Sequence, residues 1–426
     1  MHFRIARRHR ALAALIPLLG FCVSRGMYGQ STVPIFDIPQ SSVRAASNFS
    51  RILGVTSLGN SWVLANDAER RQLVLLDTAL RNPKVILDSV ADGATSYGRF
   101  AKPFIRFLAD TVLFPDLPSK SFIVISPAGS VVRTMALPRT SDFLIMATSP
   151  SSVDVRGNLY YRGLAPEIAG NSEHSAPLDS APIIRANFDS RRIDTVAKVK
   201  TQRPSEIKRI PSTDGVSRSS ITVNPLVSID EWVVESGGAL AVVRGHDYHI
   251  DWLLPDGSWY SAPKMPFDWK RVSEAERLAL MDSARTAETT LDSSRTAKLK
   301  REGNFVEVPG RGRVRLPDRP VAPIRVDFAP SNEMADYYPA IRTGAVIADL
   351  DGNIWILPTT SAQSKNGELV YDVVDRQHGL KERVRLPPGR SVVGFGHGGV
   401  VFLAGPTSSG EWFLERAVIP SLRSRR

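Results

Sequence analysis

Two groups of side chains in this sequence are suited to hold a ligand, and each group precedes an expected inner strand. Their members are Tyr97, Arg99, Lys102 and Arg106 in the first group, and Asn332, Tyr337, Tyr338 and Arg342 in the second. Guanidinium groups form paired hydrogen bonds with carboxylates, and tyrosine offers an aromatic face with a polar tip. We therefore predict that these residues line a central funnel that binds a carboxylate, a sugar or a peptide end; a structural role is the alternative.

Motifs of common hydrolases and nucleotide-binding enzymes are absent from the sequence. It contains no G-x-S-x-G, no H-E-x-x-H and no phosphate-binding glycine loop. The densest histidine cluster is His246-Asp247-Tyr248-His249, and alternation along a strand places its two histidines on opposite faces. A serine hydrolase or an NTPase is therefore disfavoured, no metal is expected at this cluster, and no catalytic residue is assigned.

Several carboxylates could line an acidic site for Ca²⁺, and they are Asp230, Glu231, Glu333, Asp336 and Asp349. The segment Asp349-Leu350-Asp351-Gly352-Asn353 resembles the start of a Ca²⁺ loop, but Thr360 stands where such a loop carries a bidentate glutamate. Asp, Gly and Asn also form tight turns, so a hairpin turn is the preferred interpretation. We expect no cofactor, with Ca²⁺ as the alternative.

One short pattern occurs six times: a few apolar residues, a tight turn rich in Gly, Asp or Asn, and an apolar run typical of a strand. The clearest copy is Asp349-Leu350-Asp351-Gly352-Asn353-Ile354-Trp355-Ile356, and the others lie at 57–64, 108–114, 154–161, 235–242 and 395–402. Further short strands follow each copy except the last, which has only one. Units of four short strands repeated radially form the blades of a β-propeller. The sequence therefore predicts an all-β, six-bladed β-propeller over residues 33–420.

The sixth copy lacks an outer strand, because the chain ends soon after residue 419. The segment Val33–Pro39 is strand-like and belongs to no other blade. We expect this N-terminal segment to supply the missing strand, which would close the ring and remove an exposed edge.

This chain resembles the secreted bacterial six-bladed β-propellers of the NHL/TolB-like type. The resemblance covers most of residues 33–420, and its most typical piece is Asp349–Ile356. It implies the architecture and says little about activity, because propellers of this kind include lyases, lactonases, dehydrogenases and pure binding proteins.

A helix is expected within the β pattern. Ser273-Glu274-Ala275-Glu276 has the form of a capping box, apolar residues follow at helical spacing, and Gly303 is a plausible stop. We predict a helix over 272–301, in a helical insertion at 270–303 between blades four and five. It would pack on one rim of the ring, or serve as a lid or docking arm. The polar stretches 165–181 and 201–220 are expected to be loops.

The N-terminus has the form of a secretory signal peptide over residues 1–26. Four arginines precede a 13-residue apolar stretch at 11–23, which is too short to span a bilayer. Its removal would take away Cys22, the only cysteine, and would lower the net charge from +11 to +6. Residues 421–426 form a basic tail. The body of the chain has no basic stripe with interleaved aromatics, so we expect no nucleic-acid partner.

These observations together predict an exported binding module, periplasmic or secreted, that recognises a small ligand or an envelope protein through its funnel. We expect a monomer without a transmembrane anchor after processing. One alternative is a metal-assisted propeller enzyme, a lactonase or lyase acting on sugar-like substrates. The other is a structural partner in an envelope complex that uses helix 272–301 and the basic tail as contacts.

Overall fold

The computed structural model divides into two units, Met1–Val33 and Pro34–Arg426. The residues that the structure describes are 33–39, 43–89, 96–98, 103–116, 119–148, 151–163, 180–201, 208–210, 218–302, 305–308, 312–315, 325–362 and 367–422. The predicted signal peptide, 1–26, and the tail beyond residue 422 lie outside them. Among the described residues, no helix is both long and apolar enough to cross a membrane.

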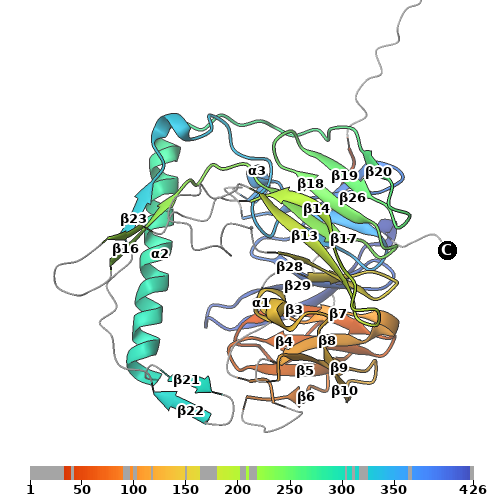
Figure 1. Cartoon of the computed structure of the whole chain (residues 1–426). Helices are drawn as coiled ribbons and strands as arrows, with labels where there is room; N and C mark the ends of the chain where they lie inside the picture. The colour runs from red at the N-terminus through yellow and green to blue at the C-terminus, as the bar shows by residue number, and fades with distance from the viewer. Residues whose placement is uncertain are drawn as a thin grey trace, which may run out of the picture. The chain divides into compact units, whose positions relative to one another are not determined.

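Within Pro34–Arg426 the described chain is mostly β, and short antiparallel strands form most of its sheets (Figure 1). Three sheets consist of four strands that follow one another in the chain. Their strands are β7 (Ile105–Arg106), β8 (Val112–Asp116), β9 (Ser121–Ile125) and β10 (Val131–Ala136); β11 (Ser151–Val153), β12 (Asn158–Arg162), β13 (Ser180–Asn187) and β14 (Ile193–Lys200); and β17 (Asp230–Val234), β18 (Leu240–Arg244), β19 (His249–Leu253) and β20 (Trp259–Ser261). Each strand pairs with its neighbour in sequence, as the repeated turn-and-strand pattern predicts.

The other large sheets contain the first and the last repeats. Their strands are β3 (Ile52–Leu58), β4 (Trp62–Asp67), β5 (Gln72–Asp77) and β6 (Lys84–Leu87); β24 (Val346–Ala348), β25 (Asn353–Ile356), β26 (Val370–Asp375) and β27 (Gly379–Arg385); and β28 (Ser391–Gly396), β29 (Val400–Pro406) and β30 (Trp412–Val418). The parallel pairing of β28 with β3 joins the last repeat to the first, with Gly394 opposite Val55. A Cβ atom on Gly394 would lie 1.7 Å from the Val55 carbonyl oxygen, so only glycine permits this approach.

The N-terminal segment pairs differently from the expectation. Strand β1 (Ile35–Asp37), within the expected segment Val33–Pro39, runs parallel to β27 and so extends the fifth repeat. The missing outer strand of the sixth repeat is instead β2 (Val43–Arg44), which pairs antiparallel with β30. The physical reason lies in the contacts of Ile38, which is buried in the cluster between the last two large sheets and whose N–H donates to the Arg385 carbonyl oxygen of β27 at 3.0 Å.

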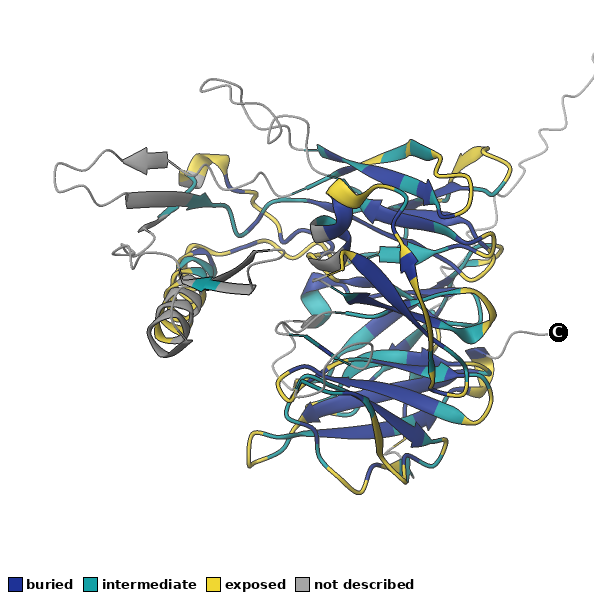
Figure 2. Cartoon of the chain, turned by 60° about the horizontal axis from the view of Figure 1, so that its bottom comes forward, coloured by how far each residue is buried: buried dark blue, intermediate teal, exposed yellow. Residues whose placement is uncertain are grey.

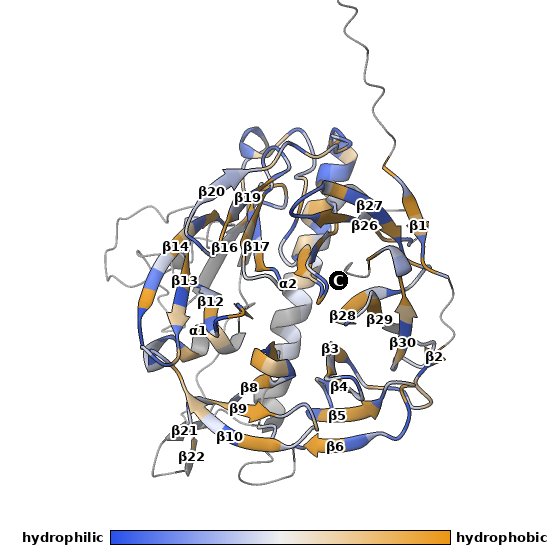
Figure 3. Cartoon of the chain, turned by 90° about the vertical axis from the view of Figure 1, so that its right-hand side faces the viewer, coloured by the Kyte–Doolittle hydropathy of each residue, from blue (hydrophilic) through white to orange (hydrophobic). Residues whose placement is uncertain are grey.

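The buried apolar residues form clusters between neighbouring sheets. One cluster joins β8 and β9 to β12 and β13, for example through Leu113 and Tyr161, and another joins the last repeat to the first through Phe402 and Leu76. Figure 2 shows that buried residues are concentrated in the strands, and Figure 3 shows the sheets arranged around a common centre. This cyclic packing of sheets is the architecture of a β-propeller.

The predicted helix is present as α2 (Glu274–Glu302). Its capping box is formed, because Ser273 N donates to Glu276 Oε2 at 3.0 Å and Glu276 N donates to Ser273 Oγ at 3.3 Å. Leu280 and Met281 on its first turns pack against a small cluster around Leu226 and Tyr338. The long helix therefore gains packing through its first part.

Additional short strands precede or follow this helix in the chain. They are β15 (Lys208–Ile210), β16 (Arg218–Val223), β21 (Phe305–Val308), β22 (Gly312–Arg315) and β23 (Arg325–Phe328). Strand β16 runs parallel to β23, so two segments more than 100 residues apart form one sheet. The stretch 201–220 is therefore not only a loop, which corrects the expectation; of 165–181, only residues 180–181 are described, and they belong to β13. Short helices complete the described structure, namely α1 (Phe143–Thr148) and α3 (Thr359–Ala362).

Candidate functional site

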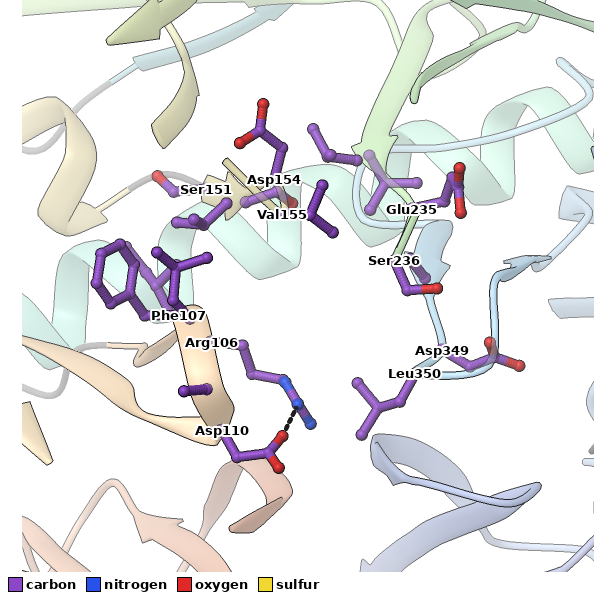
Figure 4. Close-up of a pocket in the computed structure, with 18 of the residues that line it drawn as sticks. Arg106, Phe107, Asp110, Ser151, Asp154, Val155, Glu235, Ser236, Asp349 and Leu350 are labelled. Atoms are coloured by element: carbon purple, nitrogen blue, oxygen red, sulfur yellow. Dashed lines mark hydrogen bonds and ion pairs between the residues drawn. The ribbon is translucent and has the colours of Figure 1, made fainter. Parts of the chain in front are cut away.

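A cavity of about 520 Å³ lies where the repeated turns of several sheets converge (Figure 4). Its walls are residues 105–110, 151–155, 233–236 and 348–350, with His397 from the turn between β28 and β29. Each range contains the end of an innermost strand and the start of the turn that follows it. The pattern that recurs along the sequence therefore builds the rim of one cavity.

A second cavity of about 420 Å³ continues from the first and shares Arg106, Ser152 and Leu350 with it. Its lining comes from β3, β7, β11, β17, β24 and β28, together with residues that directly precede or follow some of these strands. Most of these lining side chains are apolar, for example Val55, Trp232 and Phe395. The two cavities share lining residues and so form one channel, and the first cavity, at the turns, is its mouth.

Apolar side chains stand at the mouth of this channel. Leu108, Val155 and Leu350 each occupy the second position of their turn, and the exposed fractions of Leu108 and Val155 are 38% and 59%. In Figure 4, Val155 and Leu350 point into the cavity. A ring of exposed apolar groups at a concave site is a typical ligand contact surface.

The carboxylates at the first position of these turns have a structural role. Asp349 Oδ1 accepts hydrogen bonds from the backbone N–H groups of Asp351 and Asn353, and Oδ2 accepts from the Asn353 amide and the Trp355 indole. Asp154 and Glu235 accept hydrogen bonds from their own turns in the same way. Figure 4 shows all three carboxylates pointing away from the cavity.

These contacts bear on the Ca²⁺ alternative. Burial raises the pKa of Asp349, and hydrogen bonds from Asn353, Trp355 and the backbone oppose that rise. Both oxygens of this carboxylate are already occupied by turn and side-chain donors, which fits the hairpin interpretation. Within the described ranges, no group of three or more His, Cys, Asp or Glu side chains has the arrangement of a metal site.

Arg106, Asp110 and His397 form one connected set at the mouth. Arg106 Nη2 donates to Asp110 Oδ1 at 2.7 Å, and Arg106 Nη1 donates to Thr56 Oγ1 at 3.2 Å. His397 Nε2 lies 3.1 Å from the same Asp110 oxygen. Burial lowers the pKa of Arg106, and Asp110 opposes this effect. The guanidinium is thus oriented at the cavity wall and retains further N–H groups for a ligand.

Of the predicted binding residues, Arg106 is the described one that lines this cavity. Tyr97 does not, which corrects the prediction: it is fully buried, packs on Phe114 and donates to Asn66 Oδ1 at 2.6 Å. Burial between two sheets decides its role, and the sequence pattern does not show that burial. Arg99 and Lys102 lie outside the described residues.

The second predicted group lies at the other end of its inner strand. Asn332, Tyr337, Tyr338 and Arg342 precede β24, whereas the mouth is formed by the residues that follow β24. Tyr338 is buried in the cluster beside α2, and Tyr337 forms an isolated bridge with Arg271. Arg342 lines a separate cavity of about 350 Å³ beside α2. The structure therefore does not bring this group together with Arg106.

The histidine cluster is held by ion pairs and hydrogen bonds. His249 Nδ1 lies 2.7 Å from Asp247 Oδ1, and its Nε2 lies 3.1 Å from Asp251 Oδ1. Asp251 also accepts from Arg244 Nε at 2.7 Å. Both ring nitrogens of His249 thus have carboxylate partners.

Sequence reasoning missed Leu108, Val155, Leu350 and His397 as site residues. The signal was present, because each stands directly after the first residue of the repeated turn. A turn position shared by several repeats marks one end of the channel, even when the residue types there differ. The prediction was guided by polar residue types. These selected Arg106, which lines the cavity, and other residues such as Tyr97 and Arg342, which do not.

No protein-family model matches this chain, and no curated protein matches it. Solved structures that it resembles include a streptogramin B lyase, with a TM-score of 0.34, 11% identity, and coverage of 88% of this chain and 96% of the other. TolB from Acinetobacter baumannii has a TM-score of 0.31 and 12% identity, with coverage of 89% of this chain and 65% of the other. A member of the DUF4221 family from Bacteroides vulgatus has a TM-score of 0.40 and 9% identity, with coverage of 89% of this chain and 95% of the other. These are β-propeller proteins.

Proposed function

We propose that this chain is an exported six-bladed β-propeller that binds a small ligand at the mouth of its central channel without catalysing a reaction. The ligand class is a molecule with an apolar body and an anionic group. The observation that carries the proposal is the composition of the mouth cavity, where exposed Leu108 and Val155 and half-buried Leu350 lie around an oriented Arg106.

The two parts of the site favour different parts of such a ligand. Transfer of apolar ligand surface from water to the ring of Leu108, Val155 and Leu350 is favourable, at roughly 25 cal/mol per Å². Arg106 can add a charge-assisted hydrogen bond to a carboxylate or sulfonate, because Asp110 and Thr56 use only part of its donors. A volume of about 520 Å³ is in the range of small-molecule sites.

The test uses the fluorescent probe 1-anilinonaphthalene-8-sulfonate, which combines aromatic rings with a sulfonate. We expect saturable binding of one probe per chain and a loss of at least ~10-fold in affinity for Leu350→Asp, equivalent to about 1.4 kcal/mol. Val132→Asp is the matched control, because Val132 is 61% exposed on the outer strand β10. Arg106→Gln should weaken binding while circular dichroism and the unfolding midpoint confirm a folded chain.

Equal probe affinities for Leu350→Asp and Val132→Asp would reject the mouth as the binding site. Absence of saturable binding in the unmodified chain would reject the small-ligand proposal and would favour recognition of an envelope protein. The metal-assisted enzyme is tested separately by thermal unfolding with Ca²⁺ and with EDTA, since a metal bound only to the folded state raises the midpoint.

A further inference from the structure

A smaller cavity of about 210 Å³ lies on the sheet of β11–β14 and shares no lining residue with the mouth cavity. Its lining is polar throughout and consists of Arg156, Asn158, Arg185, Asn187, Ser190, Arg192 and Asp194. Three arginines against one aspartate leave two net positive charges around a small space. We infer that this cavity binds a compact oxyanion of the phosphate or sulfate type.

Strand register brings these side chains to one face. Asn158 of β12 lies opposite Asn187 of β13, and Arg185 of β13 lies opposite Asp194 of β14. Residues that are directly opposite, or two apart along a strand, share a face of the sheet. The same face of the sheet therefore carries Asn158, Arg185, Asn187 and Asp194. Arg192 directly precedes β14 and is two residues from Asp194, so its side chain lies on that face as well.

Hydrogen bonds orient the arginines and leave many of their donors available. Asp194 accepts from Arg185 Nη2 at 3.3 Å and from Arg192 Nε at 3.1 Å. Each guanidinium carries five N–H groups in a planar fork, which matches the oxygen atoms of phosphate or sulfate. Asp194 thus holds two guanidinium groups side by side. Arg185 also donates to the Tyr160 hydroxyl, and the remaining donors of the two arginines are available for an anion.

The side chain of Arg156 forms a hydrogen bond with the neighbouring sheet. Arg156 lies in the turn between β11 and β12, and its Nη1 donates to the carbonyl oxygen of Pro255 at 3.3 Å. Pro255 belongs to the turn after β19, in the sheet of β17–β20. The Arg156 side chain therefore reaches from the sheet of β11–β14 to the sheet of β17–β20.

The experiment is isothermal titration of the full processed chain with inorganic phosphate at pH 7 and constant ionic strength in NaCl. We expect one site per chain, a loss of at least ~10-fold in affinity for Arg185→Gln, and a smaller loss for Arg156→Gln. Arg133→Gln removes the same charge from an exposed position on β10 and should leave the affinity unchanged. Arg156→Gln is the safer variant for folding, because the Arg156 side chain is exposed and donates to a backbone carbonyl, that of Pro255.

Two further titrations separate the sources of such an anion. Tighter binding of glycerol 1-phosphate than of inorganic phosphate would indicate that the site binds a phosphate group carried on a larger molecule. Equal binding of the two would indicate that the site binds the free phosphate ion. No binding of phosphate, sulfate or glycerol 1-phosphate up to ~10 mM would overturn the inference, since that concentration already corresponds to very weak affinity. Equal affinities in Arg185→Gln, Arg156→Gln and Arg133→Gln would overturn it as well. Binding of the naphthalene sulfonate at the mouth should not change in Arg185→Gln, so the two proposals can fail separately.

Discussion

Glu231 is a buried carboxylate in the innermost strand β17, with 7% of its surface exposed. Burial raises its pKa to about 7, and this rise is opposed by the charge of Arg162 and by a hydrogen bond from the Gly344 backbone. In the unfolded chain a glutamate titrates near 4.3. The folded state therefore binds this proton more tightly than the unfolded state does.

That difference predicts a pH dependence of stability with a definite sign. The free energy of unfolding should fall as the pH rises from about 4.3 to about 7, because the unfolded chain releases the proton first, and the loss is at most ~4 kcal/mol. Glu231→Gln removes the titration and should be more stable than the unmodified chain at pH 8. Urea unfolding of both proteins between pH 4 and pH 8 measures the effect.

The control for this prediction is Glu274→Gln, at a glutamate whose side chain is 73% exposed on α2. It should keep the pH slope of the unmodified chain. If Glu231→Gln retained the same slope, or were less stable at pH 8, the assignment of the slope to Glu231 would be wrong.

Gly394 lies in the parallel pairing of β28 with β3, which joins the last repeat to the first. In Gly394→Ala the new methyl group would meet the Val55 carbonyl oxygen, so we expect the free energy of unfolding to fall by about 3 kcal/mol. Gly398→Ala is the matched control: its φ is +74° and no atom lies within 4 Å of its Cβ position, so it should cost only ~1 kcal/mol. Equal losses in urea unfolding would show that the close approach of β28 and β3 does not limit stability.

At the scale of elements, α2 depends on its first turn. Ser273→Ala removes one half of the capping box and should lower the opening free energy of the helix by about 1 kcal/mol. Ser294→Ala, at an exposed position in the interior of the helix, should not lower it, because alanine is the better helix former. Hydrogen exchange of the α2 amides, followed by mass spectrometry, distinguishes the two. Similar protection in both variants would contradict a stabilising role for the cap.

The strands beside α2 illustrate a limit of local patterns. β16 and β23 pair in parallel, although one follows the third repeat and the other precedes the fifth. Each is short, and polar and apolar residues alternate in each over only four positions, Ser220–Val223 and Arg325–Phe328. Their pairing depends on a partner more than 100 residues away, so a polar stretch that reads as a loop becomes a strand.

At the scale of the whole molecule, the N-terminal segment ties the repeats together. β1 extends the sheet of β27, Ile38 is 4% exposed, and β2 covers the edge of β30, where Arg44 lies 4.4 Å from the ring centre of Phe413. A chain that begins at residue 45 should therefore lose at least ~2 kcal/mol relative to one that begins at residue 33. The uncovered edge of β30 should also promote self-association.

Urea unfolding and light scattering after size-exclusion chromatography test both parts of this prediction. The chain that begins at residue 33 serves as the reference, because it retains β1 and β2. Equal stability and equal mass for the two chains would mean that the antiparallel pair of β2 and β30 contributes nothing to closure.

The sequence by itself predicted what neighbouring residues decide. The turn formers at 349–353 and the apolar runs after them indicated short strands, and Ser273 and Glu276 indicated a helix start; both features are present. Such signals are local, because a turn needs particular backbone conformations and a strand needs alternation over a few residues. Arg106, which lines the mouth cavity, was also among the predicted residues, because guanidinium chemistry is visible in the residue type.

Tertiary structure decided which residues share a space. It buried Tyr97 between sheets, placed Arg342 beside α2, turned Asp349 toward its own hairpin and gathered Leu108, Val155 and Leu350 at one mouth. It also paired β1 with β27 and left the last edge to β2. These outcomes depend on contacts between residues far apart in the chain, whose free energies are set by complementary packing and register, and a residue's near neighbours in sequence carry no record of that complementarity.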